Sequence, residues 1–524
     1  MKTFWYLTAF ALAVLAFAAV WLGGLNQDEG WYLYAANLVA EGQMPYRDFF
    51  YTQAPLMPLV YSAFSGIWAK WGLLGGRVFT LALGLAGTVF LVALARRLAS
   101  PERRSLASLL VAIVLCGNLY HLYYLAIPKT YALASLFVAM GFYLLTFEGA
   151  IAAAAAGICL AFACAARISL GALLPVVAVG LLVGGGKSPR GRLGWLWFGV
   201  GATAAVALVF GPFLFGPSRA GLVAAQQYHA AQQYHAARGG FDVVFSVGSL
   251  SRLVRWYLPV FVLFGLGVYA AACRKDACEA FAAPRRGLVL LLALLGFAAV
   301  FAVQMLAPMP YEDYNVPVMG LFAVGAAVLA AEALEWKGAA VALAALGMTW
   351  AGTFGSPLLQ EWMTNGQDRF WVRGKTKCEL AQLREVGRKI EEMDPGGQEL
   401  LTQDLYLAVE TGRKVPRQMA MGPFCMWSAL PYEGAEKILL NGEGMRALLE
   451  SSECKVAAMS GYAFAITAPR CDETPIELQI DYWNLLKRRY NLVFVEENFG
   501  QNATPLIVLE RKDASKGDDG TPLR

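Results

Sequence analysis

The feature that most constrains this chain is a series of apolar runs within residues 1–354. A run of about 18 or more apolar residues is long enough to cross a bilayer. Only 15% of the 524 residues are charged, against about 25% in a soluble domain. We therefore expect a polytopic α-helical membrane protein with about eleven spans, in a range of about 10 to 13. The predicted spans are 4–23, 77–95, 105–120, 130–147, 150–165, 168–184, 194–215, 256–273, 287–307, 316–334 and 338–354.

The remaining third of the chain has the composition of a soluble domain. A helical pattern covers 377–392, and short apolar runs at 400–402, 455–459, 492–496 and 506–509 predict strands. We therefore predict a transmembrane module at 1–355, a soluble α/β domain at 356–511 and a disordered tail at 512–524. The predicted domain contains four cysteines, from which we expect at least one disulfide, with the pairing open. They are Cys378, Cys425, Cys454 and Cys471.

Basic loops between the spans predict the topology, because cytoplasmic loops carry an excess of Lys and Arg. If residues 55–71 lie along the interface without crossing, all four basic loops fall on the side of the N-terminus. The loops contain Arg96, Arg97, Arg103 and Arg104, then Lys187, Arg190 and Arg192, then Arg274, Lys275, Arg285 and Arg286, and finally Lys337. We therefore expect a cytoplasmic N-terminus, with residues 26–54, 215–255 and the C-terminal domain outside.

The first external loop, residues 26–54, concentrates acidic residues directly after a span. Asp28 and Glu29 follow the end of the span, and Asp48 stands beside Arg47 before the chain turns apolar at Pro55. An ionisable residue at the membrane is costly and is a functional candidate by default. Asp28 also suits a helix N-cap, Glu29 a first helical turn, and Asp48 a surface pair. The residues alone leave both interpretations open.

The stretch DEGWYLYAANLVAEGQMPYRDFFYTQAPLMPLVY resembles the first-loop signature of bacterial polyprenol-phosphate-sugar-dependent glycosyltransferases. These belong to the GT-C superfamily, in the clan of the protein O-mannosyltransferases (glycosyltransferase family 39-like) and the lipid A aminoarabinose transferase. Three later pieces are also similar, but only the first-loop motif is specific. They are GICLAFACAARISLGALLPV, PYEDYNVPVMGLFAVGAAVLA and TQDLYLAVETGRKVP. The resemblance implies a GT-C-type fold and transfer of a sugar from a polyprenyl-phosphate carrier to an acceptor on the outer face.

The resemblance also implies catalytic roles in the first loop. The family's first-loop Asp acts as general base, which implies this role for Asp28, with Glu29 and Asp48 as further catalytic candidates. A base takes the proton of the attacking acceptor hydroxyl. Attack opposite the phosphate would invert the anomeric configuration.

The leaving polyprenyl phosphate is an anion that cations must hold. Outer-face candidates are Arg77, Lys129 and Arg167, ahead of Arg252 and Arg255. Many relatives carry a Lys immediately before the Pro that ends the first loop, whereas Ala54 stands there in this chain. If that Lys contacts the donor phosphate in those relatives, either another cation takes its place in this chain or donor binding differs.

Further residues on the same face are expected to contact substrate. They are Tyr46, Arg47, Tyr51, Glu312, Asp313 and Tyr314. The carboxylates among the candidates could supply oxygen ligands to a divalent cation, but nothing in their spacing requires one, so we expect neither a metal nor a cofactor. Two histidines six residues apart, His229 and His235, lie too far around a helix to share a metal, and an interfacial helix is expected there.

We expect the protein to lie in a bacterial inner membrane and to contact membrane lipids. Its partners would be a polyprenyl-phosphate-linked sugar and an envelope lipid, glycan or protein as acceptor, with no nucleic acid. A lipid-linked sugar flippase or a polysaccharide polymerase or ligase is the alternative. Transporters place charges near the midplane and often repeat their halves, whereas the charges here gather at one face. The sugar, acceptor and carrier length are left open.

Overall fold

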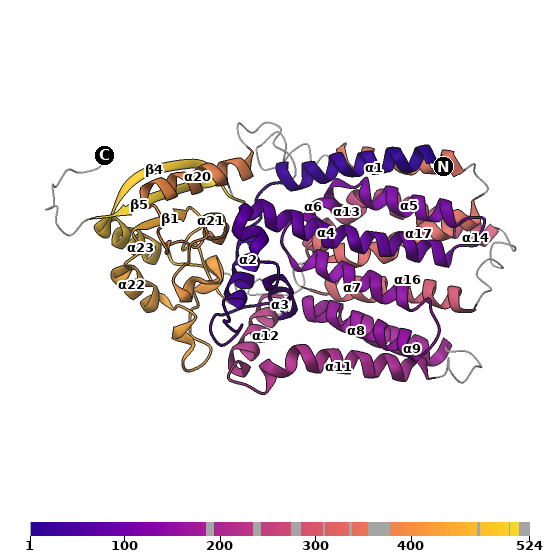
Figure 1. The fold of residues 1–524 in the computed structure, drawn as a ribbon, viewed down its shortest axis with the longest axis horizontal. Coiled ribbons are helices and arrows are strands. Elements are labelled where there is room, and N and C mark those ends of the chain that lie inside the picture. The colour runs from indigo at the N-terminus through magenta and orange to yellow at the C-terminus, as the bar shows by residue number, and fades with distance from the viewer. Residues whose placement is uncertain are drawn as a thin grey trace.

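The computed structural model describes residues 2–184, 193–233, 243–273, 284–307, 310–334, 338–354, 378–468, 472–501 and 503–512. Within these ranges, long helices run side by side as a bundle, and a smaller α/β region packs against one end of it (Figure 1). The predicted fold class, a polytopic helical membrane protein with a small C-terminal sheet, is confirmed.

Apolar helices of the bundle lie where the sequence predicted spans. Their bounds are α1 (Lys2–Phe17) with η1 (Ala18–Leu22), α4 (Gly66–Leu98), α5 (Arg104–Cys116) with α6 (Leu119–Ala126), α7 (Thr130–Leu144), α8 (Ala150–Ala166), η2 (Ile168–Ala172) with α9 (Leu173–Gly184), α11 (Gly194–Leu214), α13 (Val243–Trp256) with α14 (Leu258–Cys273), α16 (Pro284–Met305), α17 (Val316–Ala333) and α18 (Gly338–Phe354).

Length decides how many of these helices can cross a membrane alone. Among the described residues, five are long and apolar enough, or up to seven if two bent pairs, α5 with α6 and α13 with α14, each count as one span. The other predicted spans fall on shorter apolar helices. The multi-pass membrane architecture follows, and the total of about eleven crossings stays a prediction.

Residues 55–71, which we expected at the interface, form α3 (Leu56–Ser62) and the first turns of α4. The helix axis breaks at Gly72, whose φ is 61°. A Cβ there would fall 2.1 Å from the Glu410 carboxylate, which accepts a hydrogen bond from Leu73 N at 2.8 Å. The break therefore lets a C-terminal carboxylate satisfy a backbone donor inside α4.

The C-terminal region combines a three-stranded antiparallel sheet with flanking helices. Strand order is β1-β5-β4, and β1 (Val456–Ser460), β4 (Tyr490–Phe499) and β5 (Thr504–Arg511) match three of the four predicted strands. Residues 400–402 contribute only an isolated bridge, between Leu401 and Ala457. A second pair of short strands joins β2 (Ile466–Thr467) to β3 (Asp472–Glu473). The helices are α20 (Glu379–Met393), α21 (Leu405–Thr411), α22 (Gly442–Ser451) and α23 (Ile476–Arg489).

Three of the four cysteines in this region are free thiols. Cys378, Cys425 and Cys454 form no disulfide, and Cys471 lies outside the described residues. The expected disulfide is therefore not seen among them. Cys378 instead lies 2.9 Å from Trp21 O, and Cys425 and Cys454 are buried in the core of the region.

Helix α2 (Gln27–Ala40), from the first loop, lies between the bundle and the C-terminal region (Figure 1). A Cβ at Gly30 would fall 2.2 Å from the backbone nitrogen of Tyr406, at the start of α21. Gln27 N donates to Gln501 Oε1 at 2.7 Å, and Val415 N donates to the Tyr34 hydroxyl at 2.9 Å. The first loop therefore joins the two parts of the molecule.

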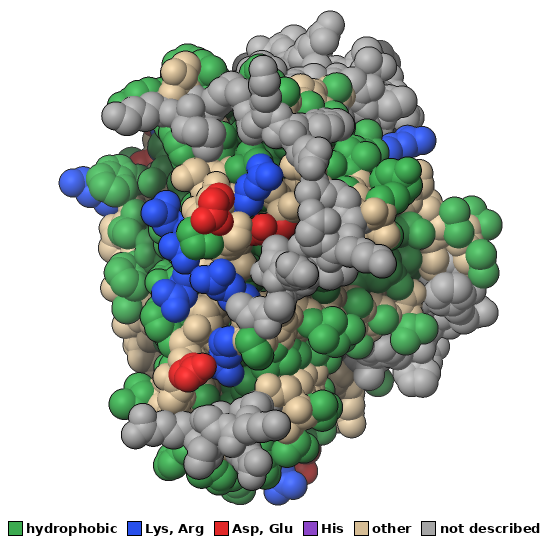
Figure 2. All heavy atoms as spheres, turned by 90° about the vertical axis from the view of Figure 1, so that its right-hand side faces the viewer, with side chains coloured by type: hydrophobic (Ala, Val, Ile, Leu, Met, Phe, Trp, Pro, Cys, Tyr) green, Lys and Arg blue, Asp and Glu red, His purple; other side chains and the backbone are tan. Residues whose placement is uncertain are grey.

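Lys and Arg side chains gather on the opposite end of the bundle, which Figure 2 faces. Arg96, Arg97 and Arg104 meet Arg285 and Arg286 there around one cavity. The first and third predicted basic loops thus lie at the same end of the molecule. Lys187, Arg190, Arg192, Arg274, Lys275 and Lys337 lie outside the described residues. Which end faces the cytoplasm stays a prediction.

Candidate active site

Helix α2 begins with a cap that leaves the Asp28 carboxylate available. Asn26 is the N-cap: its side chain accepts a hydrogen bond from Asp28 N at 3.1 Å, and its own N–H donates to Glu29 Oε1 at 2.9 Å. This reciprocal pair is a capping box. Because Asn26 caps the helix, the N-cap interpretation of Asp28 does not hold. The Asp28 side chain, 26% exposed, is directed to other partners.

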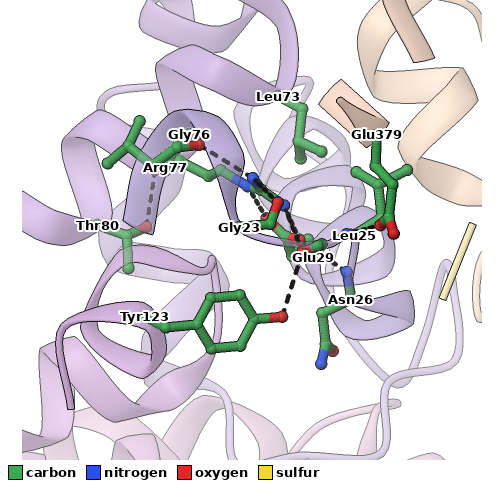
Figure 3. A network of polar contacts seen from close by, with 12 residues as sticks. Gly23, Leu25, Asn26, Glu29, Leu73, Gly76, Arg77, Thr80, Tyr123 and Glu379 are labelled. Carbon is green, nitrogen blue, oxygen red and sulfur yellow. Dashed lines mark hydrogen bonds and ion pairs between the residues drawn. The ribbon is translucent and has the colours of Figure 1, made fainter. Parts of the chain in front are cut away.

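Glu29 points the other way, into a fully buried pair with Arg77 of α4 (Figure 3). Arg77 Nε lies 2.6 Å from Glu29 Oε2, and Nη2 lies 2.7 Å from Oε1. The remaining guanidinium N–H groups donate to three carbonyls at 2.9 to 3.0 Å, those of Val20, Gly23 and Gly24.

The five N–H donors of Arg77 are thus used, and neither side chain of the pair has exposed surface. Arg77 was predicted to bind the donor phosphate and Glu29 to be catalytic. Both are corrected to a structural role, because they fasten α4 to the chain between η1 and α2 and have no donor or surface left for substrate.

Asp28 meets residues from two distant segments. Lys129, the N-cap of α7, places Nζ 2.8 Å from Asp28 Oδ2 and 3.5 Å from Asp313 Oδ2. Asp313 belongs to the short helix η3 (Glu312–Asn315) before α17. Trp31 Nε1 donates to Asp28 Oδ1 at 3.1 Å. One ammonium group therefore bridges two carboxylates at the end of the bundle nearest the C-terminal region.

Lys129 stays cationic in this cluster. Burial works to lower its pKa, but the adjacent Asp28 carboxylate and Asp313 outweigh burial and raise the pKa above its ordinary value. Lys129 is therefore a charge that can bind an anion, and not a proton acceptor at neutral pH. The carboxylates of Asp28 and Asp313 are the groups in this cluster that can accept a proton.

Arg167 lies between two aromatic rings of the same cluster. It ends α8, and its guanidinium carbon is 4.8 Å from the ring centres of both Tyr131 and Tyr314. The Tyr131 hydroxyl in turn donates to Asp313 Oδ2 at 2.8 Å. Arg167 Nε is buried and has no hydrogen-bond partner in the described part of the chain. The rings fix the plane of this cation while leaving a donor unused.

A second ion pair borders the cluster. Glu312, next to Asp313 in η3, lies 3.1 Å from Arg252 of α13. Arg255 of the same helix is exposed. The structure therefore brings together predicted residues from four separate segments. The cluster, which we call the Asp28 cluster, consists of Asp28, Lys129, Tyr131, Arg167, Asp313 and Tyr314.

The other first-loop candidates lie apart from this cluster. Asp48 pairs with Arg47 at 2.5 Å and with Arg417 of the C-terminal region at 3.2 Å. Burial works to raise the pKa of Asp48, but hydrogen bonds from Arg47 and from Met44 N outweigh it and lower the pKa. Among the described residues, Asp48 therefore joins the loop to the C-terminal region through Arg417, and Arg47 pairs with Asp48 at the surface.

Tyr46 and Tyr51 are buried beneath α2. The Tyr46 hydroxyl donates to Gln53 O at 2.5 Å. The Tyr51 ring packs edge-on against Trp31 at 5.6 Å, and its hydroxyl has no partner among the described residues. The two rings pack edge-on against each other at 6.2 Å, and a substrate contact for either residue stays a prediction.

Tyr131 is a member of the cluster that the sequence did not single out. It bonds Asp313 and stacks on Arg167, but it is one of 22 tyrosines and directly follows the start of an apolar helix. The sequence feature that could have indicated Tyr131 as a site residue is its position two residues after Lys129. Within the described ranges, no three His, Cys, Asp or Glu side chains are grouped to hold a metal. The chain's independence of metals and cofactors stays a prediction.

Comparison with known proteins finds similarity in structure alone. No protein-family model matches the chain, and no curated protein sequence matches it. Its structure is similar to that of ArnT from Cupriavidus metallidurans bound to undecaprenyl phosphate. The TM-score is 0.58 at 13% identity, over 99% of this chain and 100% of ArnT. The chain has the GT-C fold.

The apo state of the same ArnT aligns equally well, with a TM-score of 0.58 at 12% identity over 97% of this chain and 98% of ArnT. The mycobacterial arabinofuranosyltransferase AftD aligns more weakly, with a TM-score of 0.47 at 13% identity over 98% of this chain and 40% of AftD. Since the ArnT alignments span both chains almost completely, the GT-C fold here includes the C-terminal region as well as the bundle. The GT-C fold implied by the first-loop motif is confirmed.

Proposed function

We propose that this chain is an integral-membrane glycosyltransferase of the GT-C type. It would move a sugar from a polyprenyl-phosphate carrier to an acceptor at the end of the bundle that carries the C-terminal region. The observation that carries the proposal is the Asp28 cluster, in which two carboxylates and two cations from four segments converge beside the membrane helices. The GT-C fold, and undecaprenyl phosphate as the molecule bound in one ArnT structure, support this class of donor.

Three charged side chains of the cluster, those of Asp28, Arg167 and Lys129, have a task in this reaction. The acceptor hydroxyl attacks the anomeric carbon, and Asp28 takes the hydroxyl proton as general base. The bond between the anomeric carbon and the phosphate oxygen breaks, and the electron pair leaves with the polyprenyl phosphate. Attack from the face opposite the phosphate inverts the anomeric configuration.

The leaving phosphate needs fixed positive charge. Arg167 is suited to it because its plane is held by two rings and its Nε is unused by the protein. Lys129 supplies a second charge and, by bridging Asp28 and Asp313, links the phosphate to the base. These two cations together would replace the lysine that many relatives carry where this chain has Ala54.

The cell location follows from the same proposal. A multi-pass chain with Arg-rich loops at the end opposite the Asp28 cluster fits a bacterial inner membrane with its N-terminus in the cytoplasm. The acceptor, an envelope lipid, glycan or protein, would then be periplasmic. Cysteine labelling tests the orientation: Ser62→Cys at the end of α3 should react with an impermeant maleimide from the periplasm, and Ser100→Cys after α4 should not.

A transfer assay tests the activity. Membranes containing the wild-type chain are incubated with radiolabelled polyprenyl-phosphate sugars and envelope acceptors. Asp28→Asn, which keeps the size of the side chain but cannot accept a proton, should lower turnover at least about 10²-fold. Glu41→Gln is the matched control, since Glu41 is the C-cap of the same helix and pairs with Lys414 on the surface.

The alternative classes give different results in the same assay. Asp28→Asn with full turnover would remove Asp28 as the base while leaving a glycosyltransferase. A wild-type chain that moves the labelled lipid between leaflets without forming a glycosidic bond would be a flippase, and the proposal would fail.

A further inference from the structure

A cavity of about 650 Å³ lies at the end of the bundle opposite the Asp28 cluster. Figure 2 looks onto this end, where blue Lys and Arg side chains gather. Five arginines and one acid, Glu148, line the cavity. The arginines come from the end of α4, the start of α5 and the start of α16, and they are Arg96, Arg97, Arg104, Arg285 and Arg286.

Within the described part of the chain, the lining of this cavity carries more positive than negative charge, with five arginines and one glutamate. None of the five forms an ion pair with another described residue. The nearby acid Glu332 accepts hydrogen bonds from Ser100 N at 2.5 Å and Ser100 Oγ at 3.0 Å instead. Arg104 Nε and Arg285 Nε are buried without a partner among the described residues. Like charges around one cavity repel, so an anion placed among them is attracted by all five.

The protein holds some of these side chains in place without neutralising them. Arg97 Nε donates to Thr146 Oγ1 at 2.6 Å, and its guanidinium lies 3.9 Å from the Phe147 ring centre. Arg285 Nη2 donates to Phe147 O at 3.0 Å. A topology signal requires only basic residues in a loop, whereas here neutral partners fix Arg97 and Arg285 at the cavity. Arginine is the side chain best suited to bind a phosphate through two parallel hydrogen bonds.

An apolar groove adjoins the cavity. Its volume is about 470 Å³, and it shares Glu148 with the cavity. The rest of its lining comes from the start of α8 and from residues 193–197, including Ile151, which is 88% exposed, and Trp197. A cavity rich in arginine beside an exposed apolar groove matches a ligand with an anionic head and a hydrocarbon chain.

We propose that this cavity binds the headgroup of an anionic membrane lipid that carries two phosphates, with one acyl chain along the groove lined by Ile151 and Trp197. Basic pockets between membrane helices bind such headgroups. Five arginines against one glutamate exceed the charge of a single phosphodiester, which favours a lipid with two. The groove favours a lipid over a soluble polyphosphate, because a soluble anion would gain nothing from it. This site is independent of the glycosyltransferase proposal.

Lipid titration of the purified full-length chain in detergent tests the site, with bound mass read by native mass spectrometry. The probes are tetraoleoyl diphosphatidylglycerol, dioleoyl phosphatidylcholine and inorganic triphosphate. We expect one diphosphatidylglycerol to bind at least tenfold more tightly than either of the others. Triphosphate binding as tightly as the lipid would overturn the lipid assignment, and equal binding of the two lipids would overturn the site.

Variants locate the binding. Arg96→Gln/Arg286→Gln removes two lining charges, and each cation is worth about fivefold in affinity. The double variant should therefore bind diphosphatidylglycerol at least tenfold more weakly. Arg103→Gln is the matched control, one residue before Arg104 but outside the lining, and it should stay within about twofold of wild type. An equal loss in the control would overturn the proposal.

A folding defect would weaken lipid binding and would not tighten it, so Glu148→Gln tests the site independently of folding. It removes the one acid of the lining, so binding should tighten by about fivefold. Weaker or unchanged binding in this variant would contradict an anion in the cavity, even if the double variant failed to fold.

Discussion

At the residue scale, the most specific prediction about donor binding concerns Arg167. Its guanidinium carbon lies over the rings of Tyr131 and Tyr314, 4.8 Å from each ring centre. A lysine keeps the charge but cannot stack its plane or offer forked donors. We therefore expect Arg167→Lys to lower kcat/KM for the lipid-linked donor about 10- to 100-fold, a loss of about 1.4 to 2.7 kcal/mol of transition-state binding.

Initial rates over a range of donor concentrations measure this effect. Arg167→Gln, which also removes the charge, should lose more than Arg167→Lys. Arg219→Gln is the control, since Arg219 is an exposed cation at the start of α12 (Arg219–Gln233). Equal kcat/KM for Arg167→Lys and wild type would mean that the planar geometry has no role in catalysis.

Asp48 gives a prediction about pH. Its pKa is lowered in the folded protein by hydrogen bonds from Arg47 and Met44 N, against the effect of burial. The unfolded chain therefore holds the proton more tightly, so the stabilisation is present above the ordinary carboxyl pKa of about 3.9. It is lost as pH falls through the lowered folded pKa.

Since both arginine partners are about half exposed, the contribution is within about 1 kcal/mol. Unfolding temperatures between pH 3 and 7 measure it. Asp48→Asn should lower the unfolding temperature slightly at pH 7 and show a shallower loss toward pH 3 than wild type. Parallel curves for the two proteins would rule out a contribution from this carboxylate.

Individual site residues could be predicted from the sequence, but their partners could not. Asp28, Lys129, Arg167 and Asp313 were candidates because each charge stands at the predicted outer end of an apolar segment. Glu29 satisfies the same criterion, and yet it is fully buried against Arg77. Adjacent residues on a helix point about 100° apart, so one faces the cluster and the other the core. The packing of α4 against α2 decides which of the two residues faces the cluster and which one is buried in the core.

At the element scale, the Arg77–Glu29 pair joins α4 to the start of α2. Removing one partner leaves the other charge buried and unpaired, which costs about 3–5 kcal/mol. We therefore expect Arg77→Met to unfold at much lower temperature than wild type, or to fail to accumulate. Arg77→Met/Glu29→Gln should recover part of the loss, because the second change removes the stranded charge.

Thermal unfolding of wild type, Arg77→Met, Glu29→Gln and the double variant, each purified in detergent, completes this double-mutant cycle. The control is the surface pair Arg388 and Glu392 in α20, both more than 60% exposed. Arg388→Gln there should cost no more than about 0.5 kcal/mol. A similar small cost for Arg77→Met would show that the buried pair does not hold the two helices together.

Helices were easier to predict than their exact ends and packing. The apolar runs located the bundle helices because lipid requires each segment to satisfy its own backbone hydrogen bonds. The bend of 71° between α5 and α6 carries no comparable signal. It places Lys129, a few residues after α6, beside Asp28, and such a long-range contact depends on tertiary packing.

At the scale of the whole molecule, the C-terminal region is attached to the helix that carries the proposed base. Contacts along the length of α2 reach this region, from Gln27 at its start to Glu41 just after its end. The sequence predicted a C-terminal α/β domain from composition, but nothing in it indicated that this domain would pack on the first loop. A movement of the region would therefore move Asp28 relative to Lys129, which belongs to the bundle.

Gly30 tests this coupling, because the backbone of α2 lies against the start of α21 at this residue. An added Cβ would fall 2.2 Å from Tyr406 N and 2.6 Å from the carbonyl carbon of Leu405. Backbone atoms cannot turn aside as a side chain can, so Gly30→Ala must separate the two helices. We expect a loss of about 1–3 kcal/mol in stability and a fall in transfer rate, since the helix that moves holds Asp28.

Gly66→Ala is the control, because Gly66 lies in α4 with nothing within 4 Å of the added Cβ. It should leave the transfer rate unchanged, and it should leave the stability unchanged or raise it by up to about 1 kcal/mol. Unfolding temperature and initial transfer rate measured on both variants separate a local clash from a general effect of alanine. If Gly30→Ala loses stability but keeps its full rate, the C-terminal region stabilises α2 without positioning the base.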